Sequence, residues 1–282
     1  MMRIRHLSTV LITGALLATT AMTSGCGAPP PGERKGGIRA RMVLWDRERS
    51  VPIQNGPVTL GRFLGVDATN NAGGVFVEVH DRYDEAKVRF RVRHINLLRQ
   101  LARAEGWDEE IFRGPWFTAE YDRGSQTGVL RIRPTDLTLP DGSRPLLDVF
   151  VYAPACDGVT IENTHGDVEI VGARGEIDVL STGRVEVRSD DPLVENLNLR
   201  STGDGVLVVA APESRGTFLI TAPQGRATFT SRYGTARSVS SERSRWNGVW
   251  NDGPNTVTLQ ADNGHARYIV KENAELYTPT FQ

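Results

Sequence analysis

A short phrase that recurs through the second half of the chain constrains the fold more than any other feature. Each copy is an alternating strand, a polar turn containing glycine and a second alternating strand, as in residues 159–170. The turn glycines stand at positions 166, 183, 203, 225 and 264, in steps of 17, 20, 22 and 39 residues, the last close to two ordinary steps. Self-similarity of this size is typical of solenoids, so we expect stacked coils of about 20 residues.

Apolar and polar side chains alternate within each copy. Val168 and Ile170 fall on one parity, whereas Asp167 and Glu169 fall on the other. A period of two indicates strands with one apolar face and one solvent-exposed face. Stacking of successive coils would pair each strand with the coils before and after it. An antiparallel sandwich would show the same alternation, but its strands recur about every 8 to 12 residues. The longer period favours an all-β, single-chain β-solenoid.

Several of these phrases, in this order, resemble a known family. The matching stretches are 147–154, an apolar strand before a proline, and the turn phrases at 163–170, 201–206 and 253–264. Together they resemble the bacterial adhesin domains of the auto-transporter adhesin head type, a domain of unknown function, over roughly residues 70 to 270. The resemblance implies a β-solenoid on the cell envelope or outside the cell, and it implies no catalytic residues.

The first half of the chain is expected to hold more β structure and one short helix. Residues 70–74 form a turn that fits an earliest copy of the repeat. Arg89 and Arg91 share one face of an alternating strand, which indicates a solvated edge strand or, as the alternative, an anionic partner. The predicted elements are strands at 58–66, 75–79, 88–92, 117–121 and 129–132, the last two forming a hairpin, and a helix carrying Ile95, Leu98, Leu101 and Ala102 that ends at Gly106.

The amino terminus has the layout of an export signal. A basic start is followed by an uncharged apolar run at 7–22, which is shorter than the about 20 residues of a membrane span. The next residues lead to Cys26 and resemble a bacterial lipobox, although Thr23 stands where an aliphatic residue is usual. We therefore predict a signal peptide at 1–25 and lipidation of Cys26, with cleavage and secretion as the alternative.

The charge balance and the cysteine content exclude some classes of function and of site. With 33 basic and 34 acidic residues the net charge is −1, so the charge gives no reason to expect binding to nucleic acid. Two cysteines exclude a disulfide-dense scaffold and a four-cysteine zinc site. Cys156 follows an apolar strand with no basic neighbour in sequence, so we expect a buried structural thiol.

The sequence contains no phosphate loop, nucleophile elbow, HExxH helix or CxxC pair, so we expect no catalytic residue, no metal and no cofactor. The enzyme alternative is a polysaccharide lyase or hydrolase, whose acid–base pair would come from carboxylates aligned on stacked strands. The candidate carboxylates are Glu162, Asp167, Glu169, Glu176, Asp178 and Glu186. His165 and His265 each adjoin a turn glycine, and a metal site shared between them is a weaker alternative.

Trp246 and Trp250 lie in a stretch rich in Gly, Asn and Pro. In an exposed loop they would stack on sugar rings or enter a partner, and the alternative is a hydrophobic lid over the last coil.

Four segments follow from these features. They are a signal peptide at 1–25, a Pro/Gly-rich tether at 26–37, an N-terminal β region with the short helix at 38–150 that caps the solenoid, and the repeats at 151–282. The sequence predicts a non-catalytic, exported lipoprotein that faces the periplasm or the cell exterior. Its expected partners are the membrane, through the lipid, and an envelope protein or surface glycan. A signalling role in envelope stress is a third hypothesis.

Overall fold

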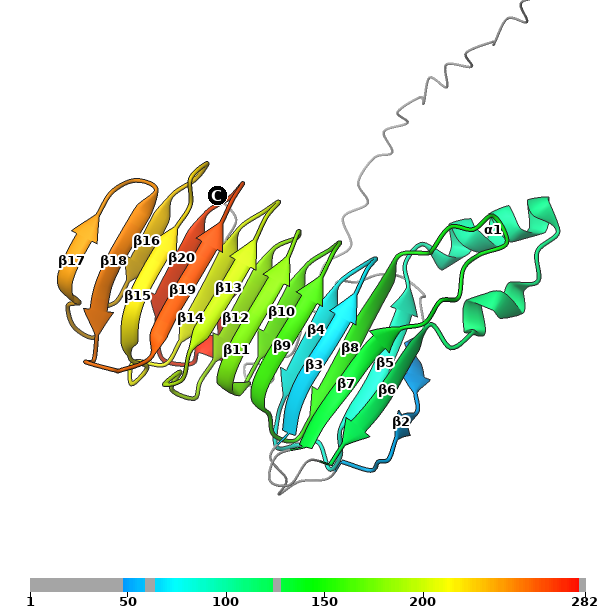
Figure 1. The fold of residues 1–282 in the computed structure, drawn as a ribbon, viewed down its shortest axis with the longest axis horizontal. Helices are drawn as coiled ribbons and strands as arrows, with labels where there is room; N and C mark the ends of the chain where they lie inside the picture. Colours follow the sequence, from blue (N-terminus) through cyan, green and yellow to red (C-terminus); the bar gives the residue numbers. More distant parts are fainter. Residues whose placement is uncertain (1–47, 59–63, 124–127, 279–282) are drawn as a thin grey trace, which may run out of the picture. The chain divides into compact units, whose positions relative to one another are not determined.

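The computed structural model describes residues 48–58, 64–123 and 128–278, all within one compact unit, Lys35–Gln282. This part is mostly β, with two large mixed sheets that lie face to face and one α-helix (Figure 1). The predicted all-β class with a short helix in the first half is therefore confirmed at this level. The two sheets are open.

The nine-stranded sheet has the order β1-β5-β8-β4-β10-β12-β14-β20-β16. Its strands are β1 (Arg49–Val51), β5 (Lys87–Val92), β8 (Leu147–Ala153), β4 (Val75–Val79), β10 (Val168–Val171), β12 (Val185–Ser189), β14 (Val206–Ala210), β20 (Ala266–Val270) and β16 (Ala227–Thr230).

The eleven-stranded sheet has the order β17-β18-β15-β19-β13-β11-β9-β3-β7-β6-β2. Its strands are β17 (Arg237–Ser241), β18 (Arg245–Trp250), β15 (Gly216–Thr221), β19 (Thr256–Ala261), β13 (Leu197–Ser201), β11 (Arg174–Ser181), β9 (Asp157–Asn163), β3 (Leu64–Asn70), β7 (Gly128–Pro134), β6 (Phe117–Asp122) and β2 (Ile53–Gln54).

Each predicted phrase forms one strand in each sheet, joined by its glycine turn. Parallel pairing keeps the register, so Ile161, Val179, Leu199 and Leu259 form one continuous inward row of the eleven-stranded sheet. All four are at most 2% exposed. Burying a side chain of this size contributes about 1.5–3 kcal/mol, and the facing valines of the other sheet complete the core.

The turn at residues 70–74 is indeed the earliest repeat, because β3 and β4 pair in parallel with β9 and β10. The repeats do not stack in sequence order at either end, however. The unit β19–β20 lies between β13–β14 and β15–β16, and β3–β4 lies between β7–β8 and β9–β10. The expectation that each strand pairs with the coils before and after it in the sequence is therefore wrong at both ends.

The 39-residue glycine step does not contain an extra repeat. After β16 the chain instead forms the antiparallel pair β17–β18, which extends the eleven-stranded sheet beyond β15. The hairpin predicted near the other end is present as β6–β7. Both ends of this sheet therefore carry antiparallel strands.

The helix α1 (Ile95–Glu105) matches the prediction and ends at Gly106, which has a left-handed φ of 72° and donates its backbone N–H to Ala102 O. Two 3-10 helices, η1 (Glu109–Arg113) and η2 (Ala274–Leu276), follow α1 and β20 respectively. The predicted strand at 58–66 overlaps residues outside the described ranges, and β3 begins at Leu64.

Candidate functional site

A row of aromatic side chains lies on the outer face of the nine-stranded sheet, over β4 and β8. Phe76 and Phe150 are register partners, and their rings stack with centroids 5.0 Å apart. Phe150 and Tyr152 follow with centroids 6.5 Å apart and planes within 8°. Tyr83, from the loop after β4, packs against Tyr152 at 5.5 Å. We call these four residues the aromatic row; all but Phe150 are half-buried, so their rings remain partly accessible.

Arginines from β5 and the neighbouring loop cover this row. The guanidinium of Arg91 lies 5.0 Å from the ring centroid of Phe150, Arg89 lies 5.7 Å from Tyr152, and Arg82 lies 4.9 Å from Tyr83. The prediction that Arg89 and Arg91 share one face of their strand is correct. The solvated-edge prediction is wrong, because β1 pairs with the outer side of β5.

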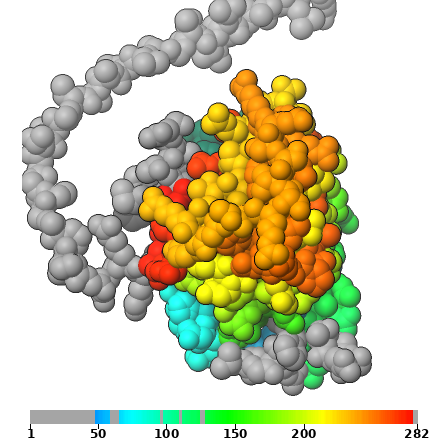
Figure 2. All heavy atoms as spheres, turned by 90° about the vertical axis from the view of Figure 1, so that its left-hand side faces the viewer, coloured from blue at the N-terminus to red at the C-terminus, as the bar shows by residue number. Residues whose placement is uncertain are grey.

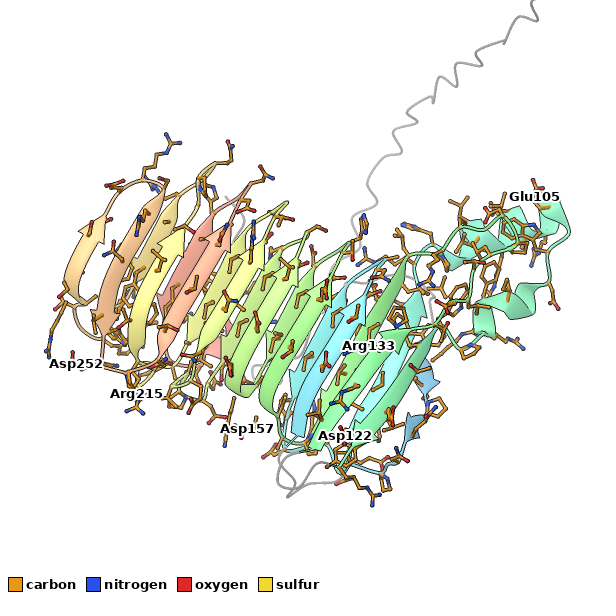
Figure 3. The ribbon with its side chains drawn as sticks, viewed as in Figure 1. Glu105, Asp122, Arg133, Asp157, Arg215 and Asp252 are labelled. Carbon is orange, nitrogen blue, oxygen red and sulfur yellow. The ribbon has the colours of Figure 1, made fainter. Side chains whose placement is uncertain are left out.

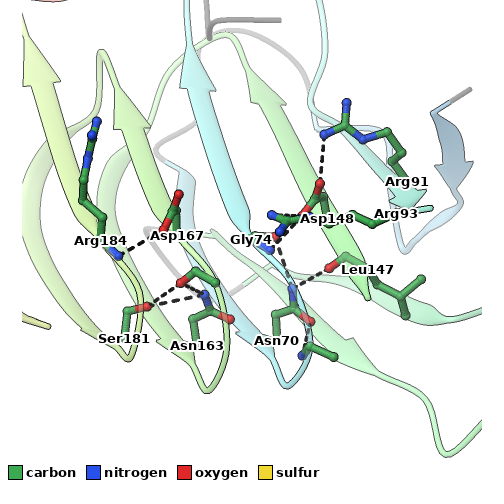
Figure 4. Close-up of polar contacts among 12 residues, drawn as sticks. Asn70, Gly74, Arg91, Arg93, Leu147, Asp148, Asn163, Asp167, Ser181 and Arg184 are labelled. Carbon is green, nitrogen blue, oxygen red and sulfur yellow. Dashed lines mark hydrogen bonds and ion pairs between the residues drawn. The ribbon is translucent and has the colours of Figure 1, made fainter. Parts of the chain in front are cut away.

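Carboxylates neutralise the same arginines. Asp148 is 1% exposed, and it accepts from Arg91 at 2.8 Å, from Arg93 at 2.6 Å and from the Gly74 backbone N–H at 2.8 Å (Figure 4). Arg89 pairs with Glu48 at 3.3 Å. Because each arginine over the row has a carboxylate partner, the face is suited to uncharged ligands that contact the exposed parts of the rings and form hydrogen bonds, rather than to polyanions.

The phenols of the row remain protonated over a wide pH range. Burial, followed by the charge of Glu48, raises the pKa of Tyr152, whose hydroxyl donates to Glu48 Oε1 at 3.3 Å. Burial also raises the pKa of Tyr83. Both groups therefore act as neutral hydroxyls, and neither is activated as a proton donor in the physiological range.

The carboxylates considered for acid–base chemistry do not gather on one face. Glu162, Glu176 and Asp178 lie on the eleven-stranded sheet. Glu169 and Glu186 are register partners on the other sheet.

Arginines neutralise the second group. Arg188 forms ion pairs with both Glu169 and Glu186, and Arg184 pairs with Glu186. Asp167 accepts the Arg184 backbone N–H at 3.1 Å. The oxygens of Glu169 and Glu186 are thus engaged by arginine, so this arrangement gives the enzyme alternative little chemistry.

The two histidines occupy separate turns. His165 Nδ1 lies 3.0 Å from Asn71 O, and His265 Nδ1 accepts the Arg226 backbone N–H at 2.9 Å. The turns of Gly183 and Gly203 separate them along the stack. Within residues 48–58, 64–123 and 128–278 no cluster of three metal-ligating side chains occurs.

Trp246 and Trp250 lie on strand β18, not in a loop, and they are 6% and 3% exposed. Trp246 stacks on Phe229 with ring centroids 4.6 Å apart, and the Trp250 indole N–H donates to Pro212 O at 3.3 Å. Their burial leaves neither indole with a free face for a sugar, and their position corresponds to the lid alternative.

Cys156 is 3% exposed and its thiol donates to Gly158 O at 3.1 Å. Burial raises its pKa to about 12, so the expected inert structural thiol is confirmed. Cys26, the signal peptide at 1–25 and the tether at 26–37 lie outside the described residues. Among the residues that are described, no helix has the length and apolar character needed to cross a membrane.

Sequence alone did not identify the aromatic row. Phe76, Phe150 and Tyr152 occupy the polar parity of their strands, and three large aromatics on that parity were a signal that could have been noticed. Their contact with Arg89 and Arg91 depends on the β5–β8 pairing, which joins segments about sixty residues apart.

Comparison with known proteins supports the fold. No protein-family model matches the chain, and no curated protein matches it either. A solved structure titled a "putative cell adhesion protein" from Clostridium sporogenes ATCC 15579 matches with a TM-score of 0.50 at 12% identity, covering 80% of this chain and 100% of that chain. At this identity the likeness shows a shared fold.

Two further solved structures are similar at lower scores. A "putative adhesin" from Bacteroides fragilis NCTC 9343 has a TM-score of 0.36 at 12% identity, covering 83% of this chain and all of that chain. A "putative lipid binding protein" from Parabacteroides distasonis ATCC 8503 has a TM-score of 0.26 at 10% identity, covering 80% and 93%.

Proposed function

We propose that the chain is a non-catalytic surface or envelope lipoprotein, in which an adhesin-like β-solenoid presents a binding face. The observation that carries this proposal is that charged side chains on the nine-stranded sheet are paired with one another. Arg188 joins Glu169 and Glu186, while Asp148 holds two arginines, so the polar groups serve packing and display. The fold shared with the structure titled a "putative cell adhesion protein" supports the same function.

In this proposal the four segments have separate tasks. Residues 1–25 direct export, Cys26 carries the lipid, and 26–37 hold the folded part away from the membrane. Residues 38–150 complete one end of the solenoid, and 151–282 supply most of its repeats. Periplasmic or outward exposure follows from export, and secretion is the alternative if Cys26 is not acylated.

The aromatic row is the proposed binding face, and its ligand is a neutral surface glycan or a partner that presents one. The exposed parts of these half-buried rings give a sugar apolar contact, and the neutral phenols of Tyr83 and Tyr152 provide hydrogen bonds. An envelope protein remains the alternative partner.

Two measurements test the proposal. Metabolic labelling with a fatty-acid analogue should mark the wild-type protein in the membrane fraction and leave Cys26→Ala unlabelled. An unlabelled, soluble wild type would contradict the lipid anchor.

For the binding face, glycan-array binding should fall several-fold in Phe76→Ala and Tyr83→Ala. The control variant Tyr233→Ala, which replaces an exposed tyrosine at the far end, should retain the binding. Equal binding by all variants would remove the aromatic row as the site.

The polysaccharide-active enzyme is the second candidate, and it rests on the adjacent pair Glu169 and Glu186. If the chain cleaves an acidic polysaccharide, Glu186→Gln should abolish the cleavage. We expect no cleavage by the wild type, because both carboxylates are ion-paired to arginine.

A further inference from the structure

The carboxy-terminal end of the stack carries a concentration of positive charge that the proposed function does not use. Residues 223–250 contain five arginines and one carboxylate, Glu242, in a chain whose net charge is only −1. This segment forms β16, β17 and β18 and the turns that join them, and it covers the end that faces the viewer in Figure 2. All five arginines are exposed.

Three of these arginines converge at one edge of the end. The turn after β15 carries Arg226, and the turn between β17 and β18 carries Arg243 and leads into Arg245. The two turns are joined by backbone hydrogen bonds from Ala227 N to Arg243 O at 2.9 Å and from Ala222 N to Ser244 O at 2.7 Å. We call Arg226, Arg243 and Arg245 the arginine corner.

The arginine corner lacks the internal neutralisation seen elsewhere. Along the sheets, Arg200 pairs with Asp262 at 3.0 Å and Arg174 with Asp191 at 2.7 Å. Within the described part of the chain, no ion pair involves the three guanidinium groups of the corner. Three like charges held on adjacent turns repel one another, and an external anion relieves that repulsion.

We propose that the arginine corner binds the phosphate groups of an anionic membrane surface. A flat lipid surface is favoured over a polysaccharide because the aromatic rings at this end, Phe229 and Trp246, stack on each other and Trp246 is buried. A sugar chain would therefore find no ring platform here. Exposed arginines on turns at the extremity of the stack reach lipid phosphates without needing a groove.

The opposite edge of the same end provides a matched control. Arg215 precedes β15, Arg232 follows β16, and Arg237 begins β17, where it pairs with Asp252 at 3.0 Å. Figure 3 labels Arg215 and Asp252 at this edge. All three arginines are exposed, so replacing them removes the same charge from the same end of the stack.

The test is vesicle co-sedimentation of the full chain. Each protein is mixed with vesicles of phosphatidylcholine alone and of phosphatidylcholine with phosphatidylglycerol. The leader and any lipid are the same in every variant, so a change in the ratio of the two affinities between variants isolates the contribution of the replaced arginines. We expect a clear preference for anionic vesicles that weakens as salt is raised. The triple variant Arg226→Gln/Arg243→Gln/Arg245→Gln should lower the preference by roughly a hundredfold, at about fivefold per arginine.

The control triple variant Arg215→Gln/Arg232→Gln/Arg237→Gln should retain most of the preference. Equal losses in the two triple variants would overturn the corner in favour of general electrostatics. Absence of any anionic preference in the wild type would overturn the proposal, as would corner-dependent binding of soluble dextran sulfate without vesicle binding. Matching circular dichroism melts would show that the variants are folded. None of these outcomes depends on glycan binding by the aromatic row, so the two proposals are tested separately.

Discussion

At the scale of single residues, buried polar side chains hold the glycine turns in line. Asn70, Asn163, Ser181 and Ser201 are successive register partners at the ends of their strands, and each is at most 2% exposed. Asn163 Nδ2 donates to Gly166 O at 2.8 Å, and Ser181 Oγ donates to the same carbonyl at 2.9 Å (Figure 4). Each turn is thereby bonded to the next, which fixes the register of the whole stack.

The stacking of turns leaves no room for a side chain at Gly183. A Cβ built there would lie 2.1 Å from Gly166 O in the neighbouring turn. Gly183→Ala should therefore lower the free energy of unfolding by about 3 kcal/mol through overpacking. Urea unfolding measures the loss.

Gly65→Ala is the matched control, because a Cβ at Gly65 meets Val129 Cγ2 at 3.5 Å and Gly128 O at 3.8 Å, which are ordinary contacts. It should change stability by less than about 1 kcal/mol. Equal effects of the two substitutions would mean that the Gly166 and Gly183 turns do not stack in this way.

At the scale of elements, the pair β17–β18 closes the carboxy-terminal end of the core. Trp246 packs edge-on against Phe218, with ring centroids 6.3 Å apart, and stacks on Phe229. Trp246→Ala should lower the free energy of unfolding by about 3–5 kcal/mol, because it opens a cavity and unpacks the end of the core. Thermal melts measure this, with Tyr233→Ala as the exposed control. A loss below about 1 kcal/mol would show that the pair does not seal the core.

The insertion of β19–β20 predicts an unusual pattern of hydrogen exchange. Ends of a chain commonly fray, but Leu259 and Tyr268 lie between other repeats and are 0% exposed. Peptides covering them should exchange as slowly as those covering Leu199, in the middle of the stack. Peptides covering β17 should exchange fastest, because all five of its residues are exposed on an edge strand. Early exchange across 256–270 would contradict the insertion.

These elements also show what sequence can predict. The strands and turns of the repeats and the helix ending at Gly106 follow from local patterns, since periodicity and glycine placement act within a few residues. The order in which the repeats stack cannot be predicted from local patterns. Every repeat has the same apolar face and the same kind of turn, so any two repeats could pair. Asp148 likewise meets Arg91 and Arg93 only through the β5–β8 pairing, and no local pattern specifies that pairing.

At the scale of the molecule, thiol and phenol groups buried between the sheets and under the aromatic row make folding sensitive to alkali. Burial raises the pKa of Cys156 from 9.0 to about 12, and it also raises the pKa values of Tyr152 and Tyr268 above 10.0. In the unfolded chain these groups lose their protons at lower pH, so the unfolded state binds fewer protons than the folded state there. The contribution of Cys156 is complete below pH 9 and is lost as pH rises from about 9 to 12, whereas that of the two tyrosines is complete below pH 10 and declines above it.

Urea unfolding between pH 8 and 11 should therefore show stability falling with pH, by up to about 1.4 kcal/mol per unit for each fully titrating group. Cys156→Ala and Tyr152→Phe should each flatten part of the slope, because they remove a group that ionises only on unfolding. Tyr233→Phe, at a tyrosine that is 45% exposed, is the matched control for removing a phenol. Constant stability of the wild type up to pH 11 would mean that the three groups titrate alike in both states, and that burial does not raise their pKa values.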